Sequence, residues 1–468
     1  MALTAAEQYL IELINRARLD PLAEASRYGI DLNADLPGGT IGVGSKQVLA
    51  PNAKLETAAV LHSQWMLATD TFSHTGSFGT NPGQRMADAG YEFSGGWSWR
   101  ENLAWSGTTG AIDLAASIDV HHEGLIRSAG HRVNIFGAEV REVGIGQVQG
   151  VFTSGGVNFN ASMLTENFAL SGTQVFVTGV AYTDRDGDAF YDIGEARTDV
   201  WFRAGDTQTD VAEAGGYAIG IAPAEAVQVT IGSGTETIAE LLIDMSAGNG
   251  KLDLVSAANG IDTLALSTSA TLVSGAANAR LLGLNDLSLV GSGDDNILFG
   301  NAGNNLIDGG AGRDSIEGGA GDDLLRGGAG RDAVWRSATD AETSPLDARG
   351  FANADLLSGG AGNDRLFGQS GHDLLIGGAG DDRLMGGGGR DVFVFETGRD
   401  TIVDFTSTVD SIVFDAAALG LAGQTVDDVL ERASVRDGSV VFDFGGDNRL
   451  TLSGISDLTQ LANDLEIV

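Results

Sequence analysis

The chain has 468 residues and a formal net charge of −37, because it carries 64 acidic and 27 basic side chains. An excess of negative charge this large disfavours binding to nucleic acid or to anionic membranes, and it favours binding of divalent cations. The absence of cysteine excludes a disulfide framework and a thiolate site. The length suffices for about three domains, and the charge is uneven, since residues 171–468 hold 47 of the acids.

The first residues predict a helix rather than an export signal. They lack the basic and apolar regions of a cleavable signal peptide, whereas Thr4 and Glu7 have the spacing of a capping box that opens a helix. Residues 4–18 then place apolar side chains on one helical face. No apolar run in the chain approaches the roughly 18 residues that cross a membrane. We therefore predict no transmembrane segment.

Further elements of both kinds are expected in the first 170 residues. Apolar spacing predicts helices at 55–69 and about 111–127. Short β patterns follow at 140–147 and 165–169. This mixture of elements favours an α/β sandwich.

Four short motifs then occur in order: Phe72-Ser73-His74, RENLA at 100–104, SAGHRVNI at 128–135 and EVGIG at 142–146. Their order and spacing resemble a bacterial CAP (SCP/PR-1-like) domain over residues 1–170. The resemblance implies an α/β/α sandwich whose central cleft gathers two His and two Glu. His74, Glu101 and His131 match three of those positions, and Gly79 stands where the fourth is often Glu.

Two imidazoles and a carboxylate suit Zn²⁺ or another transition ion with an open position for water, and they can also act as acid and base. The alternative is a structural network of buried His–Glu hydrogen bonds. His121, His122 and Glu123 are candidates for the missing ligand, or else a solvated helix face. Trp97, Trp99 and Trp105 flank Glu101 and either form walls or stack on a sugar or lipid.

Several enzyme classes are disfavoured by what the sequence lacks. His122-Glu123 is followed by Ile126 where a zinc protease motif needs its second His, and no G-x-S-x-G elbow occurs. A pore-forming toxin needs long apolar stretches, which the chain does not have. We expect binding rather than catalysis, and a metal-dependent hydrolase that uses His74, Glu101 and His131 is the competing hypothesis.

A calcium-type pattern lies at residues 184–195, between expected strands at 175–182 and 199–203. Its acids occupy loop positions 1, 3, 5, 9 and 12, the spacing of a twelve-residue calcium loop. We predict calcium ligation by Asp184, Asp186, Asp188, Asp192 and Glu195. The segment 175–232 resembles the small β-sandwich spacers of bacterial surface proteins (SdrD B-type). Residues 233–290 are interpreted as a β-rich lead-in to the glycine-rich repeats that begin at Gly291.

Between Gly291 and Phe395 the chain repeats in units of nine, G-G-x-G-x-D-x-U-x, where U is large and apolar. Glycines permit turns with positive φ, and the apolar eighth residue sits on a short strand and points inward. Stacked turns bring the sixth-position carboxylates to roughly 5 Å, a repulsion of about 3 kcal/mol per pair that a calcium ion reverses. The acids at that position are Asp314, Asp323, Asp332, Asp355, Asp364, Asp373, Asp382 and Asp391.

This pattern resembles the RTX nonapeptide repeat. It predicts a parallel β-roll in two blocks, 291–335 and 350–394, with a loop insertion at 336–349, in which each turn pairs with the turn eighteen residues on. Asn296 and Asn305 replace the acid in the first two units, so calcium should bind there more weakly.

Residues 395–468 resemble the segment that caps an RTX roll and carries an uncleaved signal for type I secretion. The resemblance implies export from a Gram-negative bacterium through the type I apparatus, and folding in calcium outside the cell.

The sequence therefore predicts a multidomain α+β protein: a CAP sandwich, a β-sandwich spacer and a C-terminal parallel β-roll. We expect a secreted, extracellular calcium-binding protein whose CAP domain binds a lipid, carbohydrate or protein ligand. Binding of Zn²⁺ or another divalent ion in the CAP cleft is an open alternative. A structural role at the cell surface or in a matrix is a further alternative.

Overall fold

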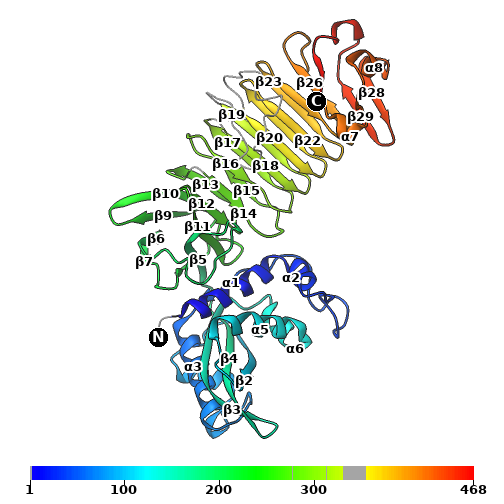
Figure 1. Ribbon diagram of the computed structural model, residues 1–468. Helices are drawn as coiled ribbons and strands as arrows, with labels where there is room; N and C mark the ends of the chain where they lie inside the picture. The colour runs from blue at the N-terminus through cyan, green and yellow to red at the C-terminus, as the bar shows by residue number, and fades with distance from the viewer. Residues whose placement is uncertain (1–2, 277, 313, 330–354) are drawn as a thin grey trace. The chain divides into compact units, whose positions relative to one another are not determined.

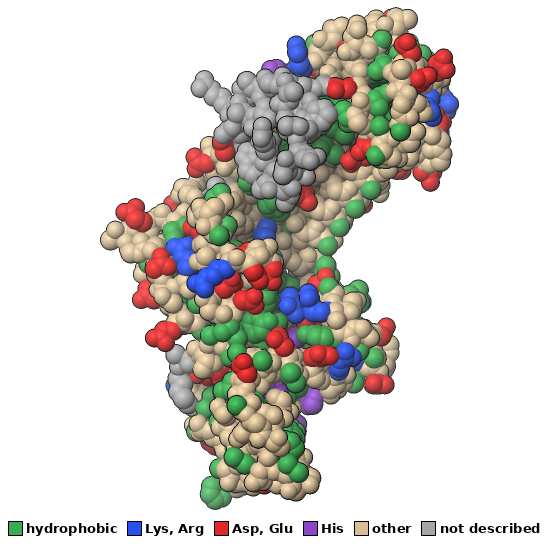
Figure 2. Space-filling model, in the orientation of Figure 1, with side chains coloured by type: hydrophobic (Ala, Val, Ile, Leu, Met, Phe, Trp, Pro, Cys, Tyr) green, Lys and Arg blue, Asp and Glu red, His purple; other side chains and the backbone are tan. Residues whose placement is uncertain are grey.

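The computed structural model describes residues 3–276, 278–312, 314–329 and 355–468. The chain forms two compact units, Met1–Ile238 with Leu242–Thr268, and Ala239–Leu241 with Ser269–Val468. Acidic side chains, drawn in red, outnumber basic ones on the face shown in Figure 2. Within the described residues, no helix has the length and apolar character needed to cross a membrane.

The first unit begins with a four-stranded sheet in the order β1-β3-β4-β2. Strands β3 and β4 form an antiparallel hairpin, β2 pairs antiparallel with β4, and β1 runs parallel to β3. The bounds are Ala50–Pro51 for β1, Trp97–Thr108 for β2, Glu142–Ser154 for β3 and Val157–Ser171 for β4. Strand β2 was not predicted from the sequence, although it carries Glu101.

Helices cover both faces of this sheet (Figure 1). On one face lie α1 and α5, whose apolar side chains pack with Val143, Ile145, Leu164 and Phe168 of the sheet. The opposite face is covered by α3, followed by α4. The helices span α1 Ala5–Leu19, α2 Pro21–Arg27, α3 Ala53–Ala68, α4 Pro82–Asp88, α5 Leu114–Arg127 and α6 Ala129–Ile135.

Local sequence explains how these helices start and how closely α3 packs. Thr4 caps α1 and forms the predicted capping box with Glu7. A Cβ on Gly144 would lie 2.1 Å from the backbone nitrogen of Glu56, and a Cβ on Gly146 would lie 2.3 Å from that of Val60. Only glycine therefore lets the backbone of α3 rest directly on β3.

The rest of the first unit is formed by strands. One sheet has the order β12-β11-β5-β8, and a second group has the order β9-β6-β7. The bounds are β5 Val175–Asp184, β6 Val200–Ala204, β7 Thr207–Asp210, β8 Gly216–Ile221, β9 Val227–Ser233, β11 Gly250–Ala257 and β12 Asp262–Leu266. Because β11 pairs parallel with β5, residues up to Thr268 belong to this unit, and the segment 233–290 is divided between the two units. Strand β10 (Glu236–Ile243) contains residues of both.

The second unit is dominated by two parallel sheets built from alternate repeats (Figure 1). One contains β13-β15-β17-β19-β21-β23-β25, continued by β29-β28-β27, and the other contains β14-β16-β18-β20-β22-β24-β26-β30. The repeat strands span β13 Ala270–Ser274, β14 Asn278–Leu281, β15 Ser288–Val290, β16 Ile297–Phe299, β17 Leu306–Ala311, β18 Ser315–Ala320, β19 Leu324–Ala329, β20 Leu356–Ala361, β21 Arg365–Ser370, β22 Leu374–Ala379, β23 Arg383–Gly388 and β24 Val392–Phe395.

The predicted eighteen-residue register holds within each block but not across the insertion. There β18 pairs with β20 and β19 with β21 at an offset of 41 residues, so that Ile316 pairs with Leu357 and Leu325 with Leu366. Within the blocks the offset is the predicted one. Ile307 pairs with Leu325, eighteen residues on, and Leu357 pairs with Leu375. These eighth-position side chains are fully buried between the sheets. The predictions for Asp332 and for the 336–349 insertion lie outside the described residues.

The segment after the repeats continues both sheets and adds a small apolar core. Phe395, Phe414, Phe442 and Phe444 pack together there, with ring centroids 5.3 to 6.5 Å apart. Its elements are β25 Arg399–Ile402, β26 Ser411–Phe414, α7 Ala416–Leu419, α8 Val426–Leu430, β27 Ala433–Arg436, β28 Ser439–Gly445, β29 Asn448–Leu452 and β30 Leu465–Ile467.

Candidate functional site

The sixth-position aspartates of the repeats form continuous ladders. In each of those that the structure describes, one carboxylate oxygen, Oδ1, accepts a hydrogen bond from the backbone N–H of the equivalent residue one turn before. The bond from Asn305 to Asp323 is 2.7 Å and that from Asp364 to Asp382 is 2.8 Å. The same contact holds Asp314, Asp355, Asp364, Asp373 and Asp391. The turns therefore line up carboxylates as the repeat predicted.

The second oxygen of these side chains is the chemically informative one. Oδ2 of Asp314, Asp323, Asp364 and Asp382 is buried and makes no hydrogen bond within the described chain. Burial raises the pKa of Asp314 and Asp323 to about 7, and that of Asp364 and Asp382 to about 6. A buried, unpartnered carboxylate oxygen is costly unless a cation compensates it.

A glycine carbonyl oxygen lies near three of these carboxylates, those of Asp314, Asp323 and Asp364. A Cβ added to Gly359 would lie 2.4 Å from Oδ2 of Asp364 and 2.5 Å from the carbonyl oxygen of Gly377. Gly309 stands in the same way between Asp314 and Gly327, at 2.4 Å from both oxygens. The glycine leaves a space bordered by a carboxylate and a carbonyl oxygen, which are the ligand types that Ca²⁺ takes in proteins. The residues of the roll thus fit calcium.

The ladder extends beyond the aspartates that the repeat predicts. Asp382 N–H donates to Asp400 Oδ1 at 3.1 Å, and Asp391 N–H donates to Asp410 Oδ1 at 3.0 Å. Burial raises the pKa of Asp400 to about 8. Continuing the count of eighteen from Asp382 would have found Asp400, although its unit lacks the first two glycines of the repeat and keeps only the fourth-position glycine, Gly398.

In the first two units an amide takes the place of the acid. Oδ1 of Asn305 accepts from the N–H of Asn301 at 2.8 Å, while its Nδ2 donates to the Asn301 side chain at 3.0 Å. Oδ1 of Asn296 likewise accepts from the N–H of Ser292 at 2.7 Å. Because these side chains are neutral, we expect weaker attraction for a cation there.

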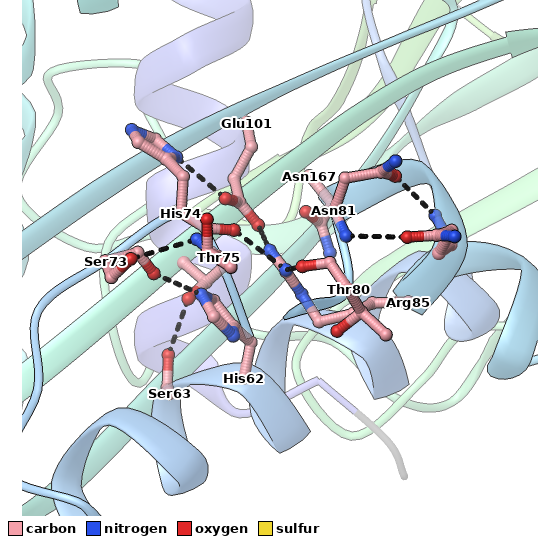
Figure 3. A network of polar contacts seen from close by, with 12 residues as sticks. His62, Ser63, Ser73, His74, Thr75, Thr80, Asn81, Arg85, Glu101 and Asn167 are labelled. Carbon is pink, nitrogen blue, oxygen red and sulfur yellow. Dashed lines mark hydrogen bonds and ion pairs between the residues drawn. The ribbon is translucent and has the colours of Figure 1, made fainter. Parts of the chain in front are cut away.

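In the CAP region, a polar network joins His74 and Glu101 to Arg85, which the sequence did not predict as part of the site (Figure 3). His74 Nδ1 lies 2.8 Å from Glu101 Oε1, and Arg85 forms an ion pair with the other carboxylate oxygen. The Glu101 side chain is 2% exposed, whereas that of His74 is 57% exposed. One imidazole nitrogen is thus held by a buried carboxylate while most of the ring faces solvent.

Helix α4 positions Arg85. Asn81 forms a capping box with Gln84 at the start of the helix. Arg85 Nη1 then donates to the carbonyl oxygens of His74 (2.9 Å) and Thr80 (3.1 Å). The guanidinium therefore fixes both the His74 loop and the Glu101 carboxylate.

His131 is not assembled with this network into a metal site. It lies on α6, where its carbonyl oxygen accepts from Asn102 Nδ2 at 3.2 Å. Burial and the nearby His74 lower the pKa of His131. In the described chain, the only group of three or more His, Cys, Asp or Glu ligand atoms within 4.8 Å of one another is elsewhere, at Asp184, Asp186 and Asp188. Both oxygens of Glu101 are already engaged and Arg85 adds positive charge, so the residues present do not fit Zn²⁺.

The prediction of a solvated or ligating face at residues 121–123 is wrong for the two histidines. Both are buried: His121 contacts Ser162 Oγ at 2.9 Å, and His122 contacts Glu24 Oε1 at 2.9 Å. Only Glu123 is partly exposed, and it pairs with Arg127 one turn along the helix. Partners on other elements, which local spacing does not reveal, bury this face of α5.

The tryptophans near Glu101 serve different purposes. Trp99 packs against Gly83 at the start of α4, and Trp105 packs edge-on against Phe152 with centroids 4.9 Å apart. Trp97 is 56% exposed. Trp99 and Trp105 are therefore packed against neighbouring residues, and of the three only Trp97 exposes much of its ring to solvent.

A cavity of about 190 Å³ borders Arg85. Its walls include Leu61, His62 and Trp65 of α3 and Thr80 of the following loop. The His62 ring stacks on Trp65 at 5.5 Å, and its Nε2 donates to the Ser73 carbonyl oxygen at 2.9 Å. An apolar wall beside polar groups is the usual composition of a small-ligand site.

The loop at 184–195 gathers three of its five predicted ligands. Oxygens of Asp184, Asp186 and Asp188 lie within 4.8 Å of one another. Glu195 is buried, and its two oxygens accept from the backbone N–H groups of Arg185 (2.8 Å) and Asp192 (3.0 Å). Burial and the neighbouring acids raise the pKa of Asp192. Glu195 thus stabilises the loop in this structure, and neither it nor Asp192 joins the three-carboxylate group.

Comparison with known families agrees with this architecture. Residues 11–155 match the Cysteine-rich secretory protein family (CAP), and four copies of the RTX calcium-binding nonapeptide repeat match between residues 288 and 402. The chain therefore carries a CAP domain followed by RTX calcium-binding repeats, and it is a calcium-binding modular protein. A search of curated proteins gave no match.

Similar solved structures cover parts of the chain only. An extracellular protein containing an SCP domain from Bacillus anthracis is 21% identical, with a TM-score of 0.21, over 34% of this chain and 39% of that one. The extracellular lipase LipA from Serratia marcescens is 20% identical, with a TM-score of 0.20, over 41% of this chain and 40% of the lipase. An outer surface protein from Borrelia burgdorferi is 18% identical, with a TM-score of 0.23, over 37% of this chain and all of that one (100%).

Proposed function

We propose that this protein acts outside the cell, where calcium folds its RTX roll and its CAP domain binds an extracellular ligand. Export through a type I apparatus of a Gram-negative bacterium is part of this proposal, because residues 395–468 resemble the export segment that follows RTX repeats. The domain layout from the sequence, with a CAP domain at 1–170 and a spacer at 175–232, belongs to the proposal as well.

The row of buried aspartates carries the calcium part. Each one that the structure describes has one oxygen satisfied by a backbone amide. Within the described residues, Oδ2 of Asp314, Asp323, Asp364 and Asp382 lacks a partner, and a glycine carbonyl oxygen lies near that of the first three. A calcium ion that occupies these spaces contributes its binding free energy to folding. Extracellular calcium modules bind at about 10⁻⁴–10⁻³ M. Such a roll stays unfolded in calcium-poor cytosol and folds after export.

The loop at 184–195 is proposed as a separate calcium site in the spacer. The support is the group formed by Asp184, Asp186 and Asp188, whose oxygens converge within 4.8 Å. In the CAP domain, the proposed ligand site is the cavity beside Arg85, where Trp65 and Leu61 offer apolar surface. A small amphipathic molecule suits that lining. The metal-dependent hydrolase hypothesis has no support in the contacts of Glu101.

A pair of adjacent substitutions tests the calcium part. Asp323→Asn keeps the Oδ1 acceptor but removes the charge of the buried, unpartnered Oδ2. We expect the calcium concentration at the folding midpoint of the roll to rise about tenfold, because ligand charge sets affinity in such sites. The measurement is a calcium titration of the full chain followed by circular dichroism.

Asp322→Asn is the matched control, because it removes the same charge from an exposed neighbour whose Oδ1 accepts from Asn363 N–H at 2.8 Å. Its midpoint should move less than about threefold. Equal shifts of the midpoint in the two variants would mean that calcium affinity depends on the overall charge of the roll rather than on the buried carboxylates.

A further inference from the structure

The spacer strands form an open groove that is separate from the calcium loop and from the CAP cavity. It has a volume of about 400 Å³, and Val200 and Trp201 of β6 lie in it beside Asp199, Gln208 and Asp210. Ligand sites commonly measure about 300–1,000 Å³ and combine apolar walls with a few polar groups. The groove therefore has the size and the composition of a binding site.

The Trp201 ring is fixed in place within this groove. Trp201 pairs with Gly232 of β9 on one side and with Asp210 of β7 on the other. A Cβ on Gly232 would lie 2.2 Å from Cζ2 of Trp201, so the indole rests over this glycine and any side chain there would displace it. Its Nε1 donates to the carbonyl oxygen of Gly234 at 3.1 Å. The guanidinium of Arg203 lies over the same ring, 5.9 Å from its centroid. With its polar edge satisfied, the ring borders the groove as a preorganised surface that is apolar except where Arg203 approaches it.

Polar side chains stand around this aromatic surface. Asp199 accepts two hydrogen bonds from Arg197, at 3.1 and 3.2 Å, and one from Ser233 at 2.9 Å. The hydrogen bonds from Arg197 lower the pKa of Asp199 to about 2, so it stays ionised. Gln208 and Asp210 are exposed, and their side chains make no hydrogen bond within the described residues. They remain available to a ligand.

We propose that this groove binds a neutral saccharide, with the C–H face of one sugar ring on Trp201 and its hydroxyl groups on Gln208 and Asp210. A sugar ring has an apolar face and a rim of groups that both donate and accept. A carboxylate accepts from two hydroxyls, and an amide both donates and accepts. A purely apolar ligand would bury these polar groups without partners. An anionic sugar would meet two carboxylates in a chain of net charge −37.

The test is calorimetric titration of the full, calcium-loaded chain with three probes. These are tetrasaccharides of β-1,4-linked glucose, of β-1,4-linked N-acetylglucosamine, and of galacturonate as the anionic comparison. We expect at least one neutral probe to bind with a Kd on the order of 1 mM or below, and the galacturonate not to bind. Absence of binding by both neutral probes at concentrations tenfold above that value overturns the proposal.

Substitutions locate the site. Trp201→Ala should weaken binding at least about tenfold, whereas Trp201→Phe, which keeps an aromatic face, should stay within about threefold. Gln208→Ala should also weaken binding, and it leaves the ring and the strand pairing untouched. Trp97→Ala is the matched control, since that ring is 56% exposed in the CAP domain.

The outcomes separate this site from the others. Thermal unfolding of each variant confirms that its fold is intact, and the Gln208→Ala result stands even where Trp201→Ala unfolds. Loss of binding in Trp97→Ala with none in the groove variants would place the sugar on the CAP domain and overturn the proposal. A normal calcium titration in a chain that binds no sugar would leave the proposed function standing while removing this inference.

Discussion

At the scale of single residues, Arg85 is the cation that compensates the buried carboxylate of the CAP network. Glu101 is almost completely buried, and its two oxygens are taken by His74 and Arg85. A buried carboxylate needs such compensation, because removing one partner leaves an uncompensated charge in a poorly solvated place. The pair thus replaces the metal that two histidines and an acid first suggest.

We expect Arg85→Ala to lower the free energy of unfolding by about 3 kcal/mol. Arg127→Ala is the control, because that arginine forms an ion pair with Glu123 in which both side chains are about half exposed (49% and 45%). Its effect should stay below about 0.5 kcal/mol. Urea unfolding of the calcium-loaded chain measures both, and equal losses would show that the Glu101 contact does not stabilise the fold.

The sequence could locate only part of this network. His74 and Glu101 lie within motifs and were predicted. Arg85 lies eleven residues beyond His74, and its role depends on where α4 starts. His121 and His122 were misjudged because Ser162 and Glu24, which bury them, come from other elements. Contacts between distant segments are not encoded in local spacing.

At the scale of elements, the roll was predicted best because each repeat contacts mainly its neighbours. The second position of the unit requires positive φ, as at Gly360 with φ +95°. A Cβ there would lie 2.1 Å from the carbonyl oxygen of Gly319 in the preceding turn of the same sheet. The third position does not require positive φ, and alanine occupies it in several units, as Ala311, Ala361 and Ala379.

Gly360→Ala should therefore destabilise the calcium-loaded roll by about 2–4 kcal/mol, from backbone strain together with the clash. Gly388→Ala is the matched control, since Gly388 is at the third position and its Cβ would meet nothing closer than 3.9 Å. That variant should be neutral, or more stable by up to about 1 kcal/mol. Differential scanning calorimetry at saturating calcium compares them. If both alanines behaved alike, the turn would be looser than these distances indicate.

At the scale of the whole molecule, the main surprise concerns where the first compact unit ends. The sequence places a boundary near residue 170, yet CAP and spacer form one unit that extends to Thr268. Lys251 on β11 explains why: it contacts Glu12 of α1 at 2.7 Å and Asp253 at 2.5 Å, all three buried. Asn249 adds hydrogen bonds to the carbonyl oxygens of Val48 (2.9 Å) and Arg141 (2.7 Å). The sequence composition does not change near these residues in a way that would predict the triad.

This triad predicts how the first unit unfolds. Lys251→Met leaves two buried carboxylates without their cation, and we expect a loss of about 3–5 kcal/mol. Adding Glu12→Gln should recover part of the loss, because a neutral amide then replaces one of the charges. Lys54→Met, at an exposed lysine of the same unit, should change little. Calorimetry should show CAP and spacer melting in a single transition that shifts down in Lys251→Met. Two separate transitions in the wild-type unit, only one of them sensitive to Lys251, would instead mean that the CAP domain folds independently of its spacer.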